Sequence, residues 1–302
     1  MKQELSLQHL RWVKITAPDD HDIQTLETEF RVHPVILREV LVPTVRPKVE
    51  TYDRHLYMVM HVPVFNKNDR KTYAEEIDCI LFENTIITVT YNELRPLEEF
   101  WNLANRSHAN PHLQQRAGHF LYHMIHHLFT FSLRQLDHIQ ESINTIEDII
   151  FYGKNESIAR DIYLVRRDII DFRRALRPQE ATTQSLIQKS IQLYGDDVRP
   201  FFQSLAGEYL RIWDLLENHR ETIRELYETN ESIVSGNINK TMKVFTVLAF
   251  LTFVPNVITN VFSVNVTGIP LENTPDAFWL VIGIATITTF LVYLILKMKQ
   301  LI

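Results

Sequence analysis

An uninterrupted apolar run near one end of the sequence strongly limits the structures that this chain can adopt. Residues 244–264 read VFTVLAFLTFVPNVITNVFSV and contain no charged side chain. As a helix, the run would be about 31 Å long, close to the thickness of the hydrocarbon core of a bilayer. Only helices and closed barrels satisfy their backbone hydrogen bonds in lipid. The run is therefore predicted to be a transmembrane helix.

A second apolar run, FWLVIGIATITTFLVYLIL, covers residues 278–296. The short segment between the two runs, residues 266–277, contains Glu272 and Asp276 but no Lys or Arg. Lysines stand before the first run and after the second, at Lys240, Lys243, Lys297 and Lys299. The positive-inside rule then places both termini in the cytoplasm and the acidic loop outside, with the chain in the plasma membrane.

The first run also contains polar residues, namely Thr246, Thr252, Asn256, Thr259, Asn260 and Ser263. Polar groups in lipid must face protein or a water-filled cavity. The sequence leaves two interpretations open, a pore lining or hydrogen bonds between neighbouring helices. Two spans cannot enclose a channel, so a pore would need several subunits around one axis.

The remaining composition fits a large cytoplasmic part. The chain has 302 residues and a net charge of −6, and its single cysteine, Cys79, excludes an internal disulfide and suits a reducing compartment. The first fifteen residues lack the apolar core of a signal peptide, so the spans are expected to carry the membrane address.

Residues 1–108 are predicted to form an α/β domain, a sheet with helices packed on it. Alternating apolar residues indicate strands at 12–16, 56–65, 77–82 and 85–91, the last two joined by a turn at Glu83-Asn84. Helices are expected from Asp20 to about Arg31 and from Pro34.

Residues 109–200 are predicted to be helical. Helical periodicity covers 113–151 and 157–177, where Pro178 ends the second helix, and a shorter helix is expected at 183–194.

Pro200 is expected to begin one stalk helix, residues 201–243, that continues into the first span to about Val261, roughly 90 Å in all. Apolar residues recur seven apart in two columns, Leu205, Ile212, Leu226 and Ile233 with His219, and Tyr209, Leu216 and Ile223. This spacing is typical of a coiled coil, and we expect the seam to pack against other copies of the chain. Packing within the subunit is the alternative.

Three histidines, His119, His123 and His127, share one helical face and could contribute to a zinc-like site. The alternative is a polar helix face, since one straight helix does not bring three ligands to a tetrahedral centre.

The motif search favours neither an enzyme nor a nucleic-acid-binding protein. The sequence has no HExxH, glycine-rich phosphate loop or nucleophile elbow. Basic pairs such as Arg166-Arg167 alternate with aspartates, which is typical of helix faces with salt bridges.

Four stretches together resemble the CorA family of divalent metal ion transporters. They are RPKVETY at 46–52 followed by LYMV at 56–59, PFF at 200–202, NKTMKV at 239–244, and the two closely spaced spans ending in Lys297-Met298-Lys299. The resemblance covers nearly the whole chain and implies a homopentamer with a funnel-shaped cytoplasmic domain. The first span, taken as 244–265, would line the pore, followed by an outer loop at 266–277 and a second span with a basic tail at 278–302.

The resemblance also assigns pore residues. It places Asn239 and Met242 at the inner mouth, with Phe245, Thr246, Phe253 and Asn256 further along the pore. The family signature Tyr-Gly-Met-Asn aligns with Phe262, Ser263, Val264 and Asn265, so only the asparagine is kept. A family aspartate that helps bind regulatory Mg²⁺ aligns with Ser204.

The predicted function is therefore transport of a divalent cation, Mg²⁺ or else Co²⁺ or Ni²⁺, by an assembly that needs no cofactor. A ring of Asn265 carbonyls would select the hydrated ion, because Mg²⁺ gives up its waters reluctantly. Two alternatives remain from the altered signature and the histidines: a ZntB-like zinc transporter, and a non-conducting family member that has lost the filter.

Overall fold

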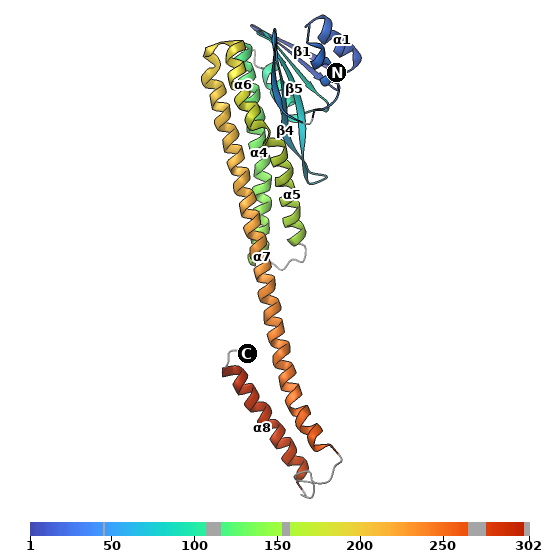
Figure 1. Cartoon of the computed structure of the whole chain (residues 1–302), viewed down its shortest axis with the longest axis vertical. Helices are drawn as coiled ribbons and strands as arrows, with labels where there is room; N and C mark the ends of the chain where they lie inside the picture. The colour runs from blue at the N-terminus through green and yellow to red at the C-terminus, as the bar shows by residue number, and fades with distance from the viewer. Residues whose placement is uncertain (45, 107–115, 153–157, 265–275, 299–302) are drawn as a thin grey trace. The chain divides into compact units, whose positions relative to one another are not determined.

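In the computed structural model, the chain divides into two compact units, Met1–Tyr227 (unit 1) and Glu228–Ile302 (unit 2). The structure describes residues 1–44, 46–106, 116–152, 158–264 and 276–298 (Figure 1). The six segments predicted from the sequence divide the chain differently from these two compact units, so the boundaries of the segments remain a prediction.

Unit 1 is built on a six-stranded sheet with the spatial order β1-β2-β6-β5-β4-β3. The strands are β1 (Lys2–Leu7), β2 (Leu10–Thr16), β3 (Lys48–Tyr52), β4 (His55–Asn66), β5 (Lys71–Leu81) and β6 (Thr85–Thr90). β2 pairs with β6 in parallel, and the other neighbouring pairs are antiparallel. The strands expected at 12–16, 56–65, 77–82 and 85–91 are confirmed. Apolar alternation did not predict β1 and β3, the two edge strands.

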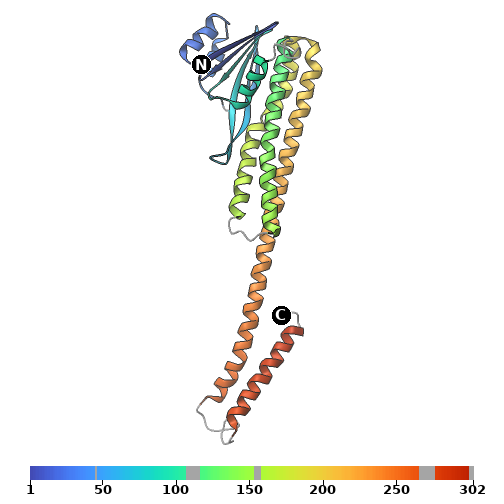
Figure 2. The ribbon, with the colours of Figure 1, turned by 180° about the vertical axis from the view of Figure 1, so that it is seen from behind.

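Alternation along the strands gives the sheet two buried faces. Trp12 on β2 points to one face, where its ring lies 4.7–5.6 Å from the rings of Phe100, Trp101 and Phe120. Its neighbours Val13 and Ile15 belong to a second cluster on the opposite face. Two helices cover that second face, α1 (Asp20–Thr28) and α2 (Pro34–Glu39), and the long helices lie on the first (Figure 2).

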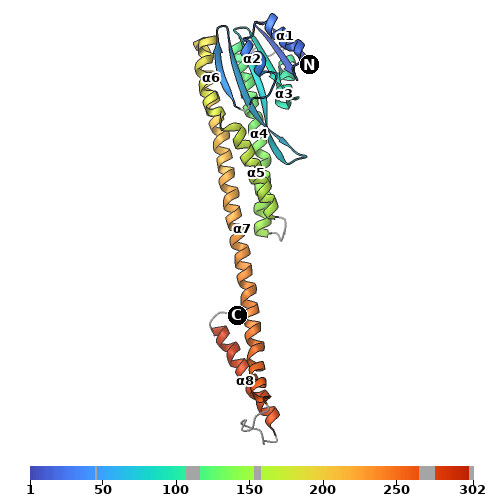
Figure 3. The ribbon, with the colours of Figure 1, turned by 45° about the vertical axis from the view of Figure 1, so that its right-hand side comes forward.

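The helices on the first face are α3 (Arg95–Arg106), α4 (Ala117–Tyr152), α5 (Ile158–Leu176), α6 (Gln179–Tyr194), a short 3₁₀ turn η1 (Asp196–Val198) and α7 (Arg199–Phe262). Figure 3 shows α4, α5 and α7 side by side. α3 was not predicted. α6 begins four residues earlier than expected because Pro178, placed as the end of the preceding helix, is also the N-cap of α6.

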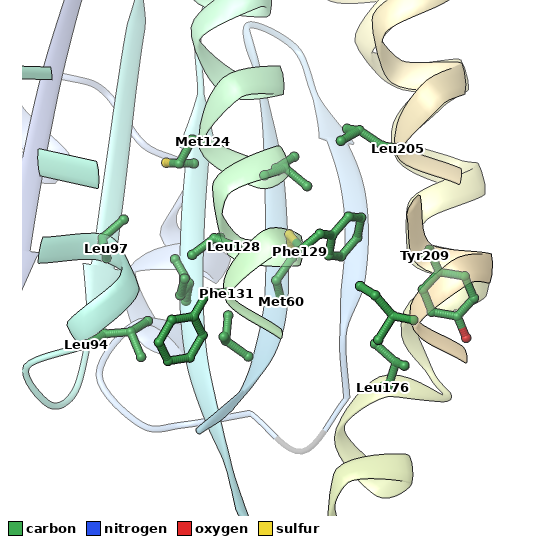
Figure 4. Close-up of a cluster of buried hydrophobic side chains, with 14 of the residues drawn as sticks. Met60, Leu94, Leu97, Met124, Leu128, Phe129, Phe131, Leu176, Leu205 and Tyr209 are labelled. Carbon is green, nitrogen blue, oxygen red and sulfur yellow. The ribbon is translucent and has the colours of Figure 1, made fainter. Parts of the chain in front are cut away.

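The larger of the two core clusters of unit 1 lies between the sheet and these helices. Figure 4 shows Met60 from β4, Leu97 from α3, Leu128 from α4, Leu176 from α5 and Leu205 from α7 in this cluster. Segments far apart in the sequence thus contribute side chains to one hydrophobic cluster, and this packing holds the first part of α7 to the sheet and its helices.

The heptad seam of α7 packs differently from our expectation. Leu205, Ile212 and Leu216 are fully buried within the single chain, and the seam remains buried as far as Leu226. These residues contact the core of their own subunit, so the prediction of a seam between copies is wrong for 205–226. Heptad spacing shows that a helix face is buried, but the same spacing serves packing within a chain and between chains. Ile233, at the end of the column, is 39% exposed.

Unit 2 consists of the C-terminal part of α7 and the helix α8 (Ala277–Met298). Both helices are long and apolar enough to span a membrane. Of the described unit 2 residues, Ala285 alone is buried. A helix that exposes apolar residues on nearly all sides is suited to lipid or to contact with other copies.

A buried carboxyl group lies in the middle of the sheet. Asp78 on β5 is fully buried, and its two oxygens accept hydrogen bonds from Tyr57 Oη (3.0 Å) and Tyr91 Oη (2.8 Å). Burial, and then the neighbouring Glu76 carboxylate, raise the pKa of Asp78 to about 7.

The first prediction concerns the seam. Ile212→Ala is expected to lower the free energy of unfolding of unit 1 by about 3 kcal/mol, because it leaves a cavity in a closed core. Leu210→Ala is the control, since Leu210 is 50% exposed and should change the value by less than about 0.5 kcal/mol. Urea unfolding of the full chain in detergent, followed by tryptophan emission, measures both. Equal effects would contradict intrasubunit packing.

The second prediction concerns pH. The pKa of Asp78 is higher in the folded chain than its ordinary value of 3.8, so the folded state binds the extra proton. Stability should fall as the pH rises towards 7, by about 2–3 kcal/mol between pH 5 and pH 8. Asp78→Asn should remove this part of the dependence and the exposed control Asp53→Asn should keep it, both measured by urea unfolding. An identical pH profile in Asp78→Asn and the wild type would refute the prediction.

Candidate pore and ion-selectivity region

One face of α7 in unit 2 contains residues spaced alternately by three and four positions. They are Asn239, Met242, Thr246, Ala249, Phe253, Asn256 and Asn260, and Ser263 continues the same spacing just after the helix ends at Phe262. Seven residues turn a helix through about 700°, so this spacing keeps a stripe on one side with a slow drift. All eight are exposed in the single chain. We call this set the polar stripe, and Phe245 lies at its edge.

The hydroxyl groups of this helix are satisfied by its own backbone. Thr246 Oγ1 donates to the carbonyl of Met242 (2.8 Å), and Ser263 Oγ donates to that of Thr259 (2.6 Å). Thr252 and Thr259 do the same one turn back. These residues can therefore face lipid at little cost, and they do not by themselves indicate a pore.

The side-chain amides of the polar stripe differ from the hydroxyl groups in their hydrogen bonding. Among the described residues, no protein group is hydrogen-bonded to the amides of Asn239, Asn256 and Asn260. Asn256 and Asn260 lie inside the apolar span. Leaving an amide there without a hydrogen-bond partner costs on the order of several kcal/mol, comparable to the free energy of transferring it from water to hydrocarbon. They need water or another polar partner on the same side of the helix.

The structure places most of the predicted pore residues on one face of α7. Asn239, Met242, Thr246, Phe253 and Asn256 share the stripe, with Phe245 beside them. Asn260 was noted as polar but was missed as a stripe member, although the spacing 239-246-253-260 identifies it. Asn265 lies outside the described residues.

α7 ends near the altered signature. Ser263 follows the last helical residue, Phe262, and its backbone N–H donates to the carbonyl of Asn260 (3.1 Å). Val264 is 52% exposed. Ser263, which the resemblance aligns with the glycine of the family signature, is thus held to the helix by two hydrogen bonds.

The histidines of α4 do not form the zinc-like site that was considered. The rings of His119 and Phe201 lie 4.8 Å apart, and His127 Nε2 lies 3.8 Å from Glu99 Oε2. Burial lowers the pKa of His127 below its ordinary value. In the described parts of the chain, no three His, Cys, Asp or Glu side chains are grouped to hold a metal ion. His119, His123 and His127 are distributed along one packed helix, which prevents their convergence.

These features define a class of protein: a membrane protein with two candidate spans, the first of which continues a long helix and bears a polar stripe.

The comparisons with known proteins give the family. Residues 8–298 match the family described as CorA-like Mg²⁺ transporter protein. The chain therefore belongs to this family of divalent cation transporters, and the family is not one of enzymes.

Individual relatives agree with this assignment. The cobalt/magnesium transport protein CorA of Thermotoga maritima is 24% identical over 271 residues, covering 89% of this chain and 75% of the relative. The zinc transport protein ZntB of Yersinia enterocolitica is 23% identical over 264 residues, covering 87% and 77%. The structure of the CorA magnesium transporter from Methanocaldococcus jannaschii shares the fold, with a TM-score of 0.85, 19% identity, and coverage of 98% of this chain and 93% of that one.

Proposed function

We propose that five copies of this chain form a pore for hydrated Mg²⁺ in the plasma membrane, with both termini in the cytoplasm. The polar stripe of each α7 faces the common axis. The divalent cation is the cargo, so no resident cofactor takes part.

The unpaired amides of Asn256 and Asn260 are the observation that carries this proposal. A water-filled axis would supply hydrogen-bond partners for them, and outward-facing lipid would not. Five symmetry-related copies turn each amide into a ring of carbonyl oxygens and N–H groups.

The apolar flank of α7 supports assembly of several copies. Val234 and Ile238 are 48% and 58% exposed, although both precede Lys240 and so lie on the aqueous side of the predicted span. Met242 and Phe245 continue this flank and are 59% and 64% exposed. Residues of this kind are normally covered, and contact with α7 of a second copy would cover them.

The chemistry of the amide rings suits a hydrated ion. Mg²⁺ is small and loses its water shell reluctantly, so carbonyls that hydrogen-bond its waters select it more easily than ligands that strip them. The membrane potential supplies the direction of transport. It is worth about 2.3 kcal/mol per charge per 100 mV, hence about 4.6 kcal/mol for a dication.

The identity of the ion depends on the altered signature around Asn265. Transport of Zn²⁺ is the competing proposal, and the similarity to ZntB favours it. The histidines that the structure describes form no metal site in support of it. Uptake of Mg²⁺, Co²⁺, Ni²⁺ and Zn²⁺ into vesicles containing the purified protein separates these ions. No uptake of any ion above that of empty vesicles would leave the non-conducting alternative.

The third prediction tests the pore lining. Asn256→Leu should reduce Mg²⁺ uptake into vesicles at least tenfold, because it replaces a polar ring by an apolar constriction that water leaves. Thr288→Leu on α8 is the matched control, since it also removes a polar group from a span, and it should leave uptake unchanged. Equal uptake by the two variants would remove Asn256 from the pore.

The fourth prediction tests the signature. Asn265→Ala should reduce uptake because it deletes a carbonyl ring at the outer mouth. The double change Ser263→Gly with Val264→Met should raise the preference for Mg²⁺ over Zn²⁺, because glycine frees the backbone at the end of the helix. The ratio of the two initial uptake rates measures this preference. An unchanged ratio would place selectivity deeper in the pore, near Asn239.

A further inference from the structure

A groove separates the two candidate spans within unit 2. Its volume is about 530 Å³, and it is lined by α7 through Leu251, Pro255 and Thr259 and by α8 through residues that include Thr286, Thr289 and Tyr293. Ala285, one of its lining residues, is 6% exposed.

The lining of the groove is largely apolar despite its three threonines and the hydroxyl group of Tyr293. Thr259 Oγ1 donates to the carbonyl of Pro255 (3.0 Å), Thr286 Oγ1 to that of Ile282 (2.8 Å) and Thr289 Oγ1 to that of Ala285 (2.7 Å). Each hydroxyl proton is thus used within its own helix. The groove is therefore suited to a hydrocarbon chain.

The groove lies deep in the predicted membrane. On α7 it covers residues 251–259, around the middle of the apolar run 244–264, and on α8 residues 282–293 of the run 278–296. At ~1.5 Å per residue, it is about 12–16 Å long, comparable with one leaflet of a hydrocarbon core of ~30 Å. Outside a water-filled pore, water is absent at this depth, so the occupant of the groove is lipid or another helix.

The direction of the groove excludes α7 of a neighbouring copy as its occupant. At ~100° per residue, Pro255 points about 140° away from the centre of the polar stripe. In a ring of five helices whose stripes face the axis, each neighbouring α7 lies only about 54° from the direction of the axis. The groove therefore opens away from the axis and from both neighbouring copies of α7. This step rests on the proposed function.

We propose that the groove between α7 and α8 binds one acyl chain of a membrane phospholipid in each subunit. The chain packs over Ala285 and against the methyl groups of the three threonines, and it fills the space that the two spans leave open. The lipid becomes a structural part of the assembly and holds α8 against the outer side of the pore helix.

The experiment uses the full chain, reconstituted in vesicles of palmitoyl-oleoyl phosphatidylcholine and phosphatidylglycerol and then extracted in mild detergent. Native mass spectrometry counts the phospholipids retained per subunit, and ion uptake is measured separately before extraction. Ala285→Phe and Thr289→Phe fill the groove. Ile287→Phe is the control, because Ile287 is 63% exposed and does not line the groove.

The expected result is one retained phospholipid per subunit in the wild type and in Ile287→Phe, and at least a fivefold loss in both groove variants with the oligomeric mass unchanged. No retained lipid in the wild type, or equal retention in all variants, overturns the inference. Dissociation of the oligomer in both groove variants also overturns it, since the groove would then hold a helix of a second copy. A wild-type chain that neither forms a pentamer nor transports ions refutes the proposed function instead.

Discussion

Hydrogen-bonding groups inside hydrocarbon need partners, and this requirement governs the membrane part of the protein. The hydroxyl groups of α7 meet it locally, because a threonine or serine reaches the carbonyl one turn back. The side chain of asparagine has two N–H donors and one carbonyl acceptor. The backbone of its own helix does not provide partners for all three. In the described part of the chain, no group of the same subunit pairs with the amides of Asn256 and Asn260. The proposed assembly around a water-filled axis would give them polar partners.

A single helix serves two different kinds of packing. Up to Leu226, α7 buries one face against the core of its own subunit, together with α4 and the sheet. Beyond that residue, it exposes both a polar stripe and an apolar flank. The seam of α7 up to Leu226 is thus covered within the single chain, and the exposed part of α7 beyond it is available for the proposed contacts with other copies. The two roles can be changed separately by substitution at different positions.

This chain and the solved archaeal CorA structure share the fold although their sequences are only 19% identical. A core that needs only apolar residues at the right positions tolerates many substitutions, provided that volume and pattern are kept. The outer mouth is different, because a selectivity filter depends on particular groups. Phe262, Ser263 and Val264 stand where the resemblance places three signature residues, and this change is therefore expected to affect ion selectivity more than the fold, as proposed above.

Several features were determined by the sequence alone, since each depends on residues close together in the chain. The length of the apolar runs predicted both spans, apolar alternation predicted four strands, and a seven-residue repeat predicted the long helix α7. The edge strands β1 and β3 and the helix α3 lacked such local signals. Only the tertiary structure decided the partner of the α7 seam, because heptad spacing shows that a face is covered without identifying what covers it. The tertiary structure also separated the self-bonded Thr259 from the unpaired Asn260, a distinction that depends on atomic contacts and not on residue type.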